Sequence, residues 1–264
     1  MTTRLLHVSD LHVGAHEDLE VAAALGQFVE QVGPQLVVAS GDLSHRGRRG
    51  QLEQAAEFLR GLGPPVLAVP GNHDLPHTPA RFVRPWAEFE RVWETTEPVA
   101  SVPGLHVVGM NSARPFHHQG GAVDTSQLER ACARLEEAEA GAARVVVLHH
   151  HLANSPWRAA HKRPLSSRRH VLHTLVGAGA ELVLSGHIHQ AAVYERHEFE
   201  VLEDGGTTTV LAVAPGLGRP RPRRLGEARG VHVHEIDGDA IVVRTHLWTR
   251  GEFALAAERR FLRR

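Results

Sequence analysis

The chain has 264 residues, 42% of them hydrophobic and 22% charged, which suits one large domain or two small ones. Its 29 Lys and Arg residues nearly balance 30 Asp and Glu residues, and a formal net charge of −1 makes general nucleic-acid binding unexpected. The single cysteine, Cys132, excludes a disulfide framework and a cysteine-rich zinc site. Since no apolar run or signal sequence predicts a membrane span or export, we expect a cytoplasmic protein.

Short runs rich in Val and Leu alternate with stretches of helical periodicity. In chain order we expect strands at 5–8, 36–39, 66–69, 105–110, 144–148 and 182–184, with helices at 17–32, 51–62 and from Ser126, where Glu129 completes a capping box. Alternating strands follow at 208–213, 231–236 and 241–246, and the Arg/Pro-rich segment 219–224 is predicted to be a loop. This order predicts a single layered α/β domain over residues 1–264, with two packed sheets and helices outside.

Nearly every predicted strand in the first 190 residues ends in Asp, Asn or His. The segments are Asp10-Leu11-His12, Gly41-Asp42, Gly71-Asn72-His73-Asp74, His149-His150-His151 and Gly186-His187-Ile188-His189. Ligands of open α/β sheets collect at the carboxyl ends of strands. Two residues apart on an extended segment, Asp10 and His12 would project to the same side. Because carboxylates combined with neutral imidazoles suit transition metals better than Ca²⁺ or Mg²⁺, the sequence predicts a transition-metal site here.

In this order the segments resemble the motifs of the calcineurin-like metallophosphoesterases: Asp-x-His, Gly-Asp-x-x-x-Arg-Gly, Gly-Asn-His-Asp, a His-rich strand end and Gly-His-x-His. The resemblance covers residues 10–189. Within the family, the stretches Val-Pro-Gly-Asn-His-Asp, Leu-His-His-His and Ser-Gly-His-Ile-His-Gln are most similar to the bacterial class III cyclic-nucleotide phosphodiesterases. The resemblance implies a four-layer αββα sandwich of two mixed sheets flanked by helices, in which the strands between about 192 and 250 form part of the second sheet.

The resemblance also implies a centre of two divalent transition-metal ions, Mn²⁺, Fe²⁺/Fe³⁺ or Zn²⁺. The first ion would be held by Asp10, His12 and His189, and the second by Asn72, His149 and His187, with Asp42 bridging both. A hydroxide bridging the two ions would attack the phosphorus in line with the leaving group.

Further residues would act on the substrate itself. His73, with Asp74 as its partner, would stabilise developing charge or protonate the leaving group. Asn72, Arg46 and His150 are candidate substrate contacts, although Arg46 equally suits a surface ion pair, and His45 is an additional imidazole without an assigned role. We therefore expect a metal-dependent phosphodiesterase for cyclic nucleotides or similar small phosphoesters.

Several alternatives stay open. A phosphomonoesterase is one, and a sugar-lipid pyrophosphatase is another if residues 82–93 form an apolar insertion rather than the core face of a helix. A DNA-repair nuclease fits less well, because only residues 190–264 follow the last motif and the net charge is near zero. A non-catalytic scaffold is disfavoured because all seven ligand positions are filled. The basic segments 157–163 and 219–224 could line the substrate pocket or be solvated loops.

Overall fold

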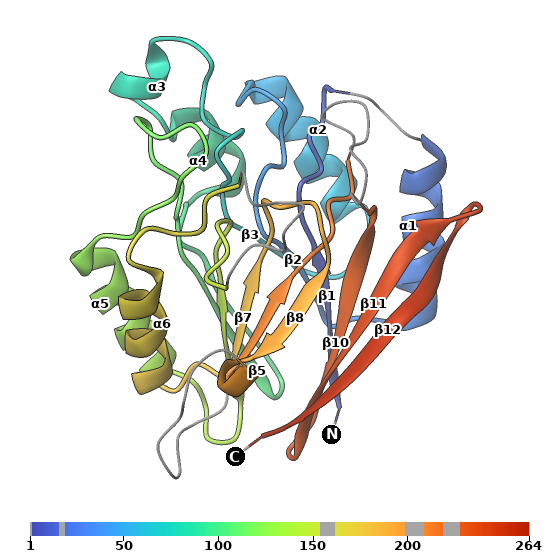
Figure 1. The fold of residues 1–264 in the computed structure, drawn as a ribbon. Coiled ribbons are helices and arrows are strands. Elements are labelled where there is room, and N and C mark those ends of the chain that lie inside the picture. The colour runs from blue at the N-terminus through green and yellow to red at the C-terminus, as the bar shows by residue number, and fades with distance from the viewer. Residues whose placement is uncertain (1, 16–18, 154–161, 199–208, 219–227, 264) are drawn as a thin grey trace.

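The computed structural model describes residues 2–15, 19–153, 162–198, 209–218 and 228–263. Within these residues, two six-stranded sheets pack against each other in the centre of the molecule (Figure 1). The strand order is β12-β11-β10-β1-β2-β3 in the first sheet and β4-β5-β6-β7-β9-β8 in the second. Both sheets are mixed, because antiparallel strands lie beside a parallel group in each.

The first sheet consists of β1 (Thr3–Val8), β2 (Leu36–Ala39), β3 (Val66–Ala68), β10 (Gly230–Ile236), β11 (Ala240–Thr249) and β12 (Glu252–Leu262). The second consists of β4 (Val99–Val102), β5 (Leu105–Gly109), β6 (Ala143–Val147), β7 (Leu182–Ser185), β8 (Ala192–Glu195) and β9 (Val210–Val213). Strands β1, β2 and β3 are parallel to one another, as are β5, β6, β7 and β9. The carboxyl ends within each parallel group therefore lie at one edge of its sheet.

Helices cover both outer faces (Figure 1). The first sheet is covered by α1 (Leu19–Val32), α2 (Arg49–Arg60) and α4 (Ala87–Trp93), and the second by α5 (Thr125–Glu136) and α6 (Arg168–Gly177). The short α3 (Ala80–Val83) precedes α4, and a 3₁₀ turn spans Arg196–Glu198. This succession of helix, sheet, sheet and helix confirms the expected four-layer α/β sandwich. None of the described helices is long and apolar enough to cross a membrane.

Burial on both faces of the central strands explains their continuous apolar runs. In β1, Leu6 and Val8 pack under the helices of the first sheet, whereas Leu5 faces the second sheet. In β6, Val146 packs under α5 and α6, whereas Val145 faces the first sheet. Strands covered on both sides lose the alternation of a half-exposed strand. The three resulting core layers hold the strand ends, and the loops that follow them, in place.

The sheet membership of the C-terminal strands corrects the expectation. Only β8 and β9 join the second sheet, whereas β10, β11 and β12 extend the first, because β10 pairs with β1 and places His232 opposite His7. Strand β12 escaped prediction because it is an edge strand in which only Phe253 and Phe261 are buried. An apolar pattern shows which face of a strand is buried, but not which strand lies beside it.

The apolar segment 82–93 is not one helix. Pro85 separates α3 from α4, since proline lacks an amide hydrogen and disfavours a helical residue before it. Phe89 and Trp93 of α4 lie in the core with α2, whereas Phe82 is 55% exposed. Helix α4 therefore presents a core face, as one of the two interpretations of residues 82–93 expected, and is not an apolar insertion.

The N-terminus of α5 also differs from the prediction. The N-cap is Asp124, and Gln127 completes the capping box, in place of Ser126 and Glu129. The sequence contains two overlapping capping boxes, and Asp is as effective an N-cap as Ser.

Candidate metal centre

The loops after β1, β2, β6 and β7 bring expected ligands together from four separate parts of the chain. The ligand atoms of Asp10, His12 and His189 lie within 4.8 Å of one another, as do those of Asp42, His149 and His187. All of these side chains are buried. These groups contain six of the seven ligands expected from the sequence, and the seventh, Asn72, stands on the loop after β3.

The first group is compact. The Nε2 atom of His189 lies 3.1 Å from Oδ1 of Asp10 and 3.4 Å from Nε2 of His12. The same His12 nitrogen lies 3.8 Å from Oδ1 of Asp10. One oxygen and two nitrogen atoms thus surround a common point, as a cation requires.

Asp42 lies between the two groups. Its Oδ2 atom is 3.7 Å from Nε2 of His12 and 3.4 Å from Nε2 of His149. That His149 nitrogen is in turn 3.2 Å from Nδ1 of His187. A single carboxylate oxygen therefore faces a ligand nitrogen of each group.

In each of the two carboxylates, Asp10 and Asp42, one oxygen accepts hydrogen bonds from the protein and the other faces the ligand group. Oδ2 of Asp10 accepts hydrogen bonds from Ser9 Oγ at 2.7 Å and from the His187 backbone at 2.9 Å. Oδ1 of Asp10, Oδ2 of Asp42 and Oδ1 of Asn72 are buried and have no hydrogen-bond partner among the described residues. Buried acceptors are normally satisfied, so this set of oxygens fits a cation.

The electrostatics also favour a cation. Burial alone would raise the pKa values of Asp10 and Asp42, but the imidazoles around them outweigh burial and hold both well below the ordinary range. Burial would lower the pKa of His149, yet Asp42 raises it to about 9. Burial keeps the pKa values of His12 and His187 well below the ordinary range. The site therefore favours positive charge beside Asp42, in the position that a metal ion would take.

The backbone of the site is strained. Eight described non-glycine residues have positive φ, and five of them are expected metal ligands. These are Asp10 (54°), His12 (50°), Asp42 (52°), His187 (74°) and His189 (57°). Such conformations cost free energy and persist where the surrounding structure enforces them. The ligand pairs therefore converge through tight turns, not along an extended segment as the spacing suggested, and β1 ends two residues before Asp10.

Two motif glycines are required by close approach. Gly41 has φ of 92°, and a Cβ atom there would lie 2.7 Å from Nδ1 of His149. A Cβ atom on Gly71 would overlap Oδ1 of Asp42. Asn72 follows directly after Gly71 and is buried.

His73 lies at the outer side of the centre and is half-buried. Its ring centroid is 4.7 Å from that of His12, in an edge-to-face arrangement. Its Nδ1 atom is 3.0 Å from the backbone oxygen of His45, and its backbone N–H donates to Oδ1 of Asp42 at 2.8 Å. The structure therefore places this imidazole against the first ligand group.

Asp74 does not contact the His73 imidazole, contrary to the expected partnership. Its carboxylate accepts hydrogen bonds from the backbone of Ser44 at 2.7 Å, Gly71 at 2.8 Å and Leu43 at 3.2 Å. The Ser44 hydroxyl also donates to it at 2.9 Å. Burial raises the pKa of Asp74 to about 6. Through these hydrogen bonds the Asp74 carboxylate links the loop after β2 to the loop after β3.

The other expected substrate contacts differ in position. Arg46 is exposed, and its backbone N–H donates to Oε1 of Gln51. His150 is fully buried, with Nδ1 2.9 Å from the Ser112 hydroxyl and its ring 4.7 Å from that of His187. Of the basic segments, residues 157–161 and 219–224 lie outside the described residues, whereas Lys162 is buried.

Two serines that orient the ligands were not predicted from the sequence. Ser9 donates to Asp10, and the Ser40 backbone oxygen lies 2.8 Å from Nδ1 of His149. A histidine that binds a metal through one nitrogen usually donates from the other to such an acceptor. In the sequence, only their position beside the motifs could have indicated this role of Ser9 and Ser40.

Comparison with known proteins identifies the class. A model of the calcineurin-like phosphoesterase family matches residues 3–191, and the chain belongs to this family. The family consists of phosphoester hydrolases that normally use a dinuclear metal centre, and the two ligand groups could hold one.

Particular relatives agree with this class. A Synechococcus protein described as a probable cyclic nucleotide phosphodiesterase is 28% identical over 213 residues, covering 74% of this chain and 77% of that protein. A purple acid phosphatase from yellow lupin seeds matches the fold with a TM-score of 0.70 at 12% identity, over 97% of this chain and 53% of the plant chain. A dimetal phosphatase from Danio rerio has a TM-score of 0.66 at 13% identity, over 99% of each chain. The two structural matches support the fold.

Proposed function

We propose that this protein hydrolyses phosphodiesters, namely cyclic nucleotides or similar small diesters, in a centre that holds two divalent transition-metal ions. The observation that carries the proposal is Oδ2 of Asp42, a buried oxygen without a hydrogen-bond partner among the described residues, which faces His12 in one group and His149 in the other. In this assignment Asp10, His12 and His189 hold one ion, Asn72, His149 and His187 hold the other, and Asp42 is shared.

The donor set suits Mn²⁺, Fe²⁺/Fe³⁺ or Zn²⁺, because it combines carboxylate and amide oxygens with imidazole nitrogens. Two such ions, when bound, neutralise charge on the phosphoryl group and activate water as the nucleophile. Two divalent ions would leave this centre positive, since Asp10 and Asp42 are the only carboxylates among the proposed ligands and Asn72 adds a neutral oxygen. A net positive centre attracts an anionic ester.

His73 supplies the proton for the leaving group in this proposal. With Nδ1 donating to the backbone oxygen of His45, Nε2 is the nitrogen that can face the substrate. An imidazolium there donates its Nε2 proton to the departing alkoxide and becomes neutral. Asp74 acts at a distance, by holding the loop that carries His73.

A diester is favoured over a monoester because the motif loops add little further cationic charge. Arg46 is the one Arg or Lys within the five sequence motifs, and it is exposed. The similarity to the Synechococcus protein supports the same substrate class. A phosphomonoesterase is the competing activity, since a metal pair also accepts a dianion.

The proposal includes a cytoplasmic location, which the absence of any possible internal disulfide supports.

The test is a substrate panel on metal-loaded protein at one pH. We expect a higher kcat/KM for bis(p-nitrophenyl) phosphate than for p-nitrophenyl phosphate, and hydrolysis of 2′,3′- or 3′,5′-cyclic AMP. An Asp10→Asn variant, purified in parallel, measures contaminating phosphatases. A monoester preference of about ten-fold, ~1.4 kcal/mol in transition-state free energy, would overturn the diesterase assignment. Hydrolysis of none of these esters would reject the proposed function.

A further inference from the structure

A second imidazole, that of His45, accompanies His73 at the outer side of the centre. One ring nitrogen from each of His12, His45 and His73 lies within 4.8 Å of the other two. The His45 ring is nearly parallel to that of His73, with centroids 5.7 Å apart and an interplanar angle of 23°. This position, between Ser44 and Arg46, is one of the three unspecified positions of the Gly-Asp-x-x-x-Arg-Gly motif.

The positions of His45 and His73 favour contact with substrate over binding of a third cation. His12 is fully buried and already belongs to the first ligand group. His45 and His73 are half-buried, so they lie between that ligand group and solvent. Side chains in this layer face whatever binds outside His12, and for a phosphoesterase that is the phosphoryl group.

Phosphodiesters and phosphomonoesters differ in the number of non-bridging oxygens on the phosphorus. A phosphodiester monoanion has two non-bridging oxygens, whereas a phosphomonoester dianion has three. A metal pair can serve two phosphoryl oxygens, so the third needs a donor from the protein. In a diester that position carries an alkyl or aryl group and accepts much less well.

We propose that the His45 side chain donates a hydrogen bond to the third non-bridging oxygen of a phosphomonoester and thereby sets the ratio of monoester to diester hydrolysis. This inference rests on the proposed function and gives His45 and His73 different tasks. His73 acts on the leaving group, and His45 contacts the oxygen that only a monoester presents. The enzyme would then retain a secondary activity on the monoester product of its own diester reaction.

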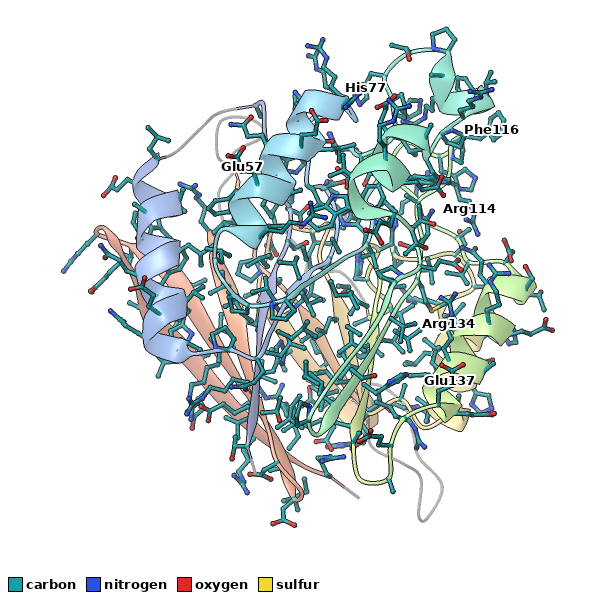
Figure 2. All side chains as sticks on the ribbon, turned by 180° about the vertical axis from the view of Figure 1, so that it is seen from behind. Glu57, His77, Arg114, Phe116, Arg134 and Glu137 are labelled. Atoms are coloured by element: carbon teal, nitrogen blue, oxygen red, sulfur yellow. The ribbon has the colours of Figure 1, made fainter. Side chains whose placement is uncertain are left out.

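A substitution of the His45 side chain leaves the contact with Nδ1 of His73 in place, because that contact runs through the backbone oxygen of His45. His77 provides a matched control, because it is exposed and its ring lies one step further out, 6.2 Å from that of His73 (Figure 2).

The kinetic test compares His45→Ala, His45→Gln and His77→Ala at equal metal content. In His45→Ala we expect kcat/KM for p-nitrophenyl phosphate to fall about ten-fold or more, as loss of a hydrogen bond to a charged oxygen implies, and that for bis(p-nitrophenyl) phosphate to fall less than about three-fold. His45→Gln, which keeps an N–H donor, should recover part of the monoester rate, and His77→Ala should match the wild type. Equal loss on both esters, or no loss on either, would overturn the proposal.

A binding test separates this inference from the proposed function. Calorimetry on metal-loaded protein should show inorganic phosphate binding about ten-fold more weakly to His45→Ala than to the wild type, with dimethyl phosphate unchanged. If the wild type hydrolyses no ester but shows this difference, the proposed function fails and the His45 contact stands. If both anions weaken together, or neither does, the His45 contact is wrong whatever the activity.

Discussion

The backbone N–H of His73 donates a hydrogen bond to Oδ1 of Asp42 at 2.8 Å. This bond fixes the orientation of the shared carboxylate, so that its other oxygen points between the two ligand groups. It also joins the proposed proton donor to the proposed bridging ligand through the main chain. The side chain of His73 can therefore be removed without disturbing Asp42.

Replacing His73 with Ala should leave the metal content unchanged and lower turnover by roughly 10²–10⁴-fold for esters with poor leaving groups, the usual effect of a general acid. The loss should be much smaller for p-nitrophenolate, which hardly needs protonation. A series of aryl and alkyl diesters measures this dependence. Equal impairment across the series would show that His73 acts by electrostatic stabilisation alone.

Asp74→Ala should destabilise the fold and leave the leaving-group dependence as it is. The carboxylate accepts bonds from Leu43, Ser44 and Gly71, and buried donors left without partners cost about 1–3 kcal/mol each. We expect the free energy of unfolding in urea to fall by about 2–5 kcal/mol. A variant of unchanged stability that loses the leaving-group dependence would restore Asp74 as the partner of the imidazole.

Metal binding should release a proton from His149. Asp42 raises the pKa of this imidazole to about 9, and a ligand nitrogen must be deprotonated to bind. Affinity for Mn²⁺ or Zn²⁺ should therefore rise with pH up to about 9 and level off above it. Titration calorimetry at pH 7.5 in buffers of different ionisation enthalpy measures the protons released. Binding without proton release would contradict a raised pKa of His149 in the metal-free protein.

Acid should destabilise the metal-free protein through His232. Burial lowers the pKa of this residue from 6.5 to about 4, and its Nε2 lies 3.1 Å from the Val213 backbone oxygen. Because the fold keeps His232 neutral, its contribution to stability is complete above pH 6.5 and is lost as the pH falls toward about 4. In urea unfolding with a chelator, His232→Gln should reduce the loss of stability over this range by up to about 3 kcal/mol. Parallel pH profiles for the variant and the wild type would be inconsistent with this role.

The sequence predicted two packed sheets with helices outside, and a cluster of polar residues at the strand ends, for a physical reason. Strands such as 36–39 and 182–184 are apolar throughout because both faces are buried, and polar residues directly after them could only lie at the end of a sheet. The same local reading could not show that β10 pairs with β1, since pairing depends on distant residues. It also could not show that the Asp74 carboxylate turns away from His73, because the backbone donors that hold it come from residues 43, 44 and 71.

The most direct test of the shared centre is the metal stoichiometry of purified, metal-saturated protein by elemental analysis after desalting. The wild type should hold two ions per chain, and so should His73→Ala, which keeps every proposed ligand. Asp42→Ala should lose both ions, because Oδ2 of Asp42 faces a ligand nitrogen of each group. One ion per wild-type chain, or two ions retained by Asp42→Ala, would contradict a centre bridged by this carboxylate.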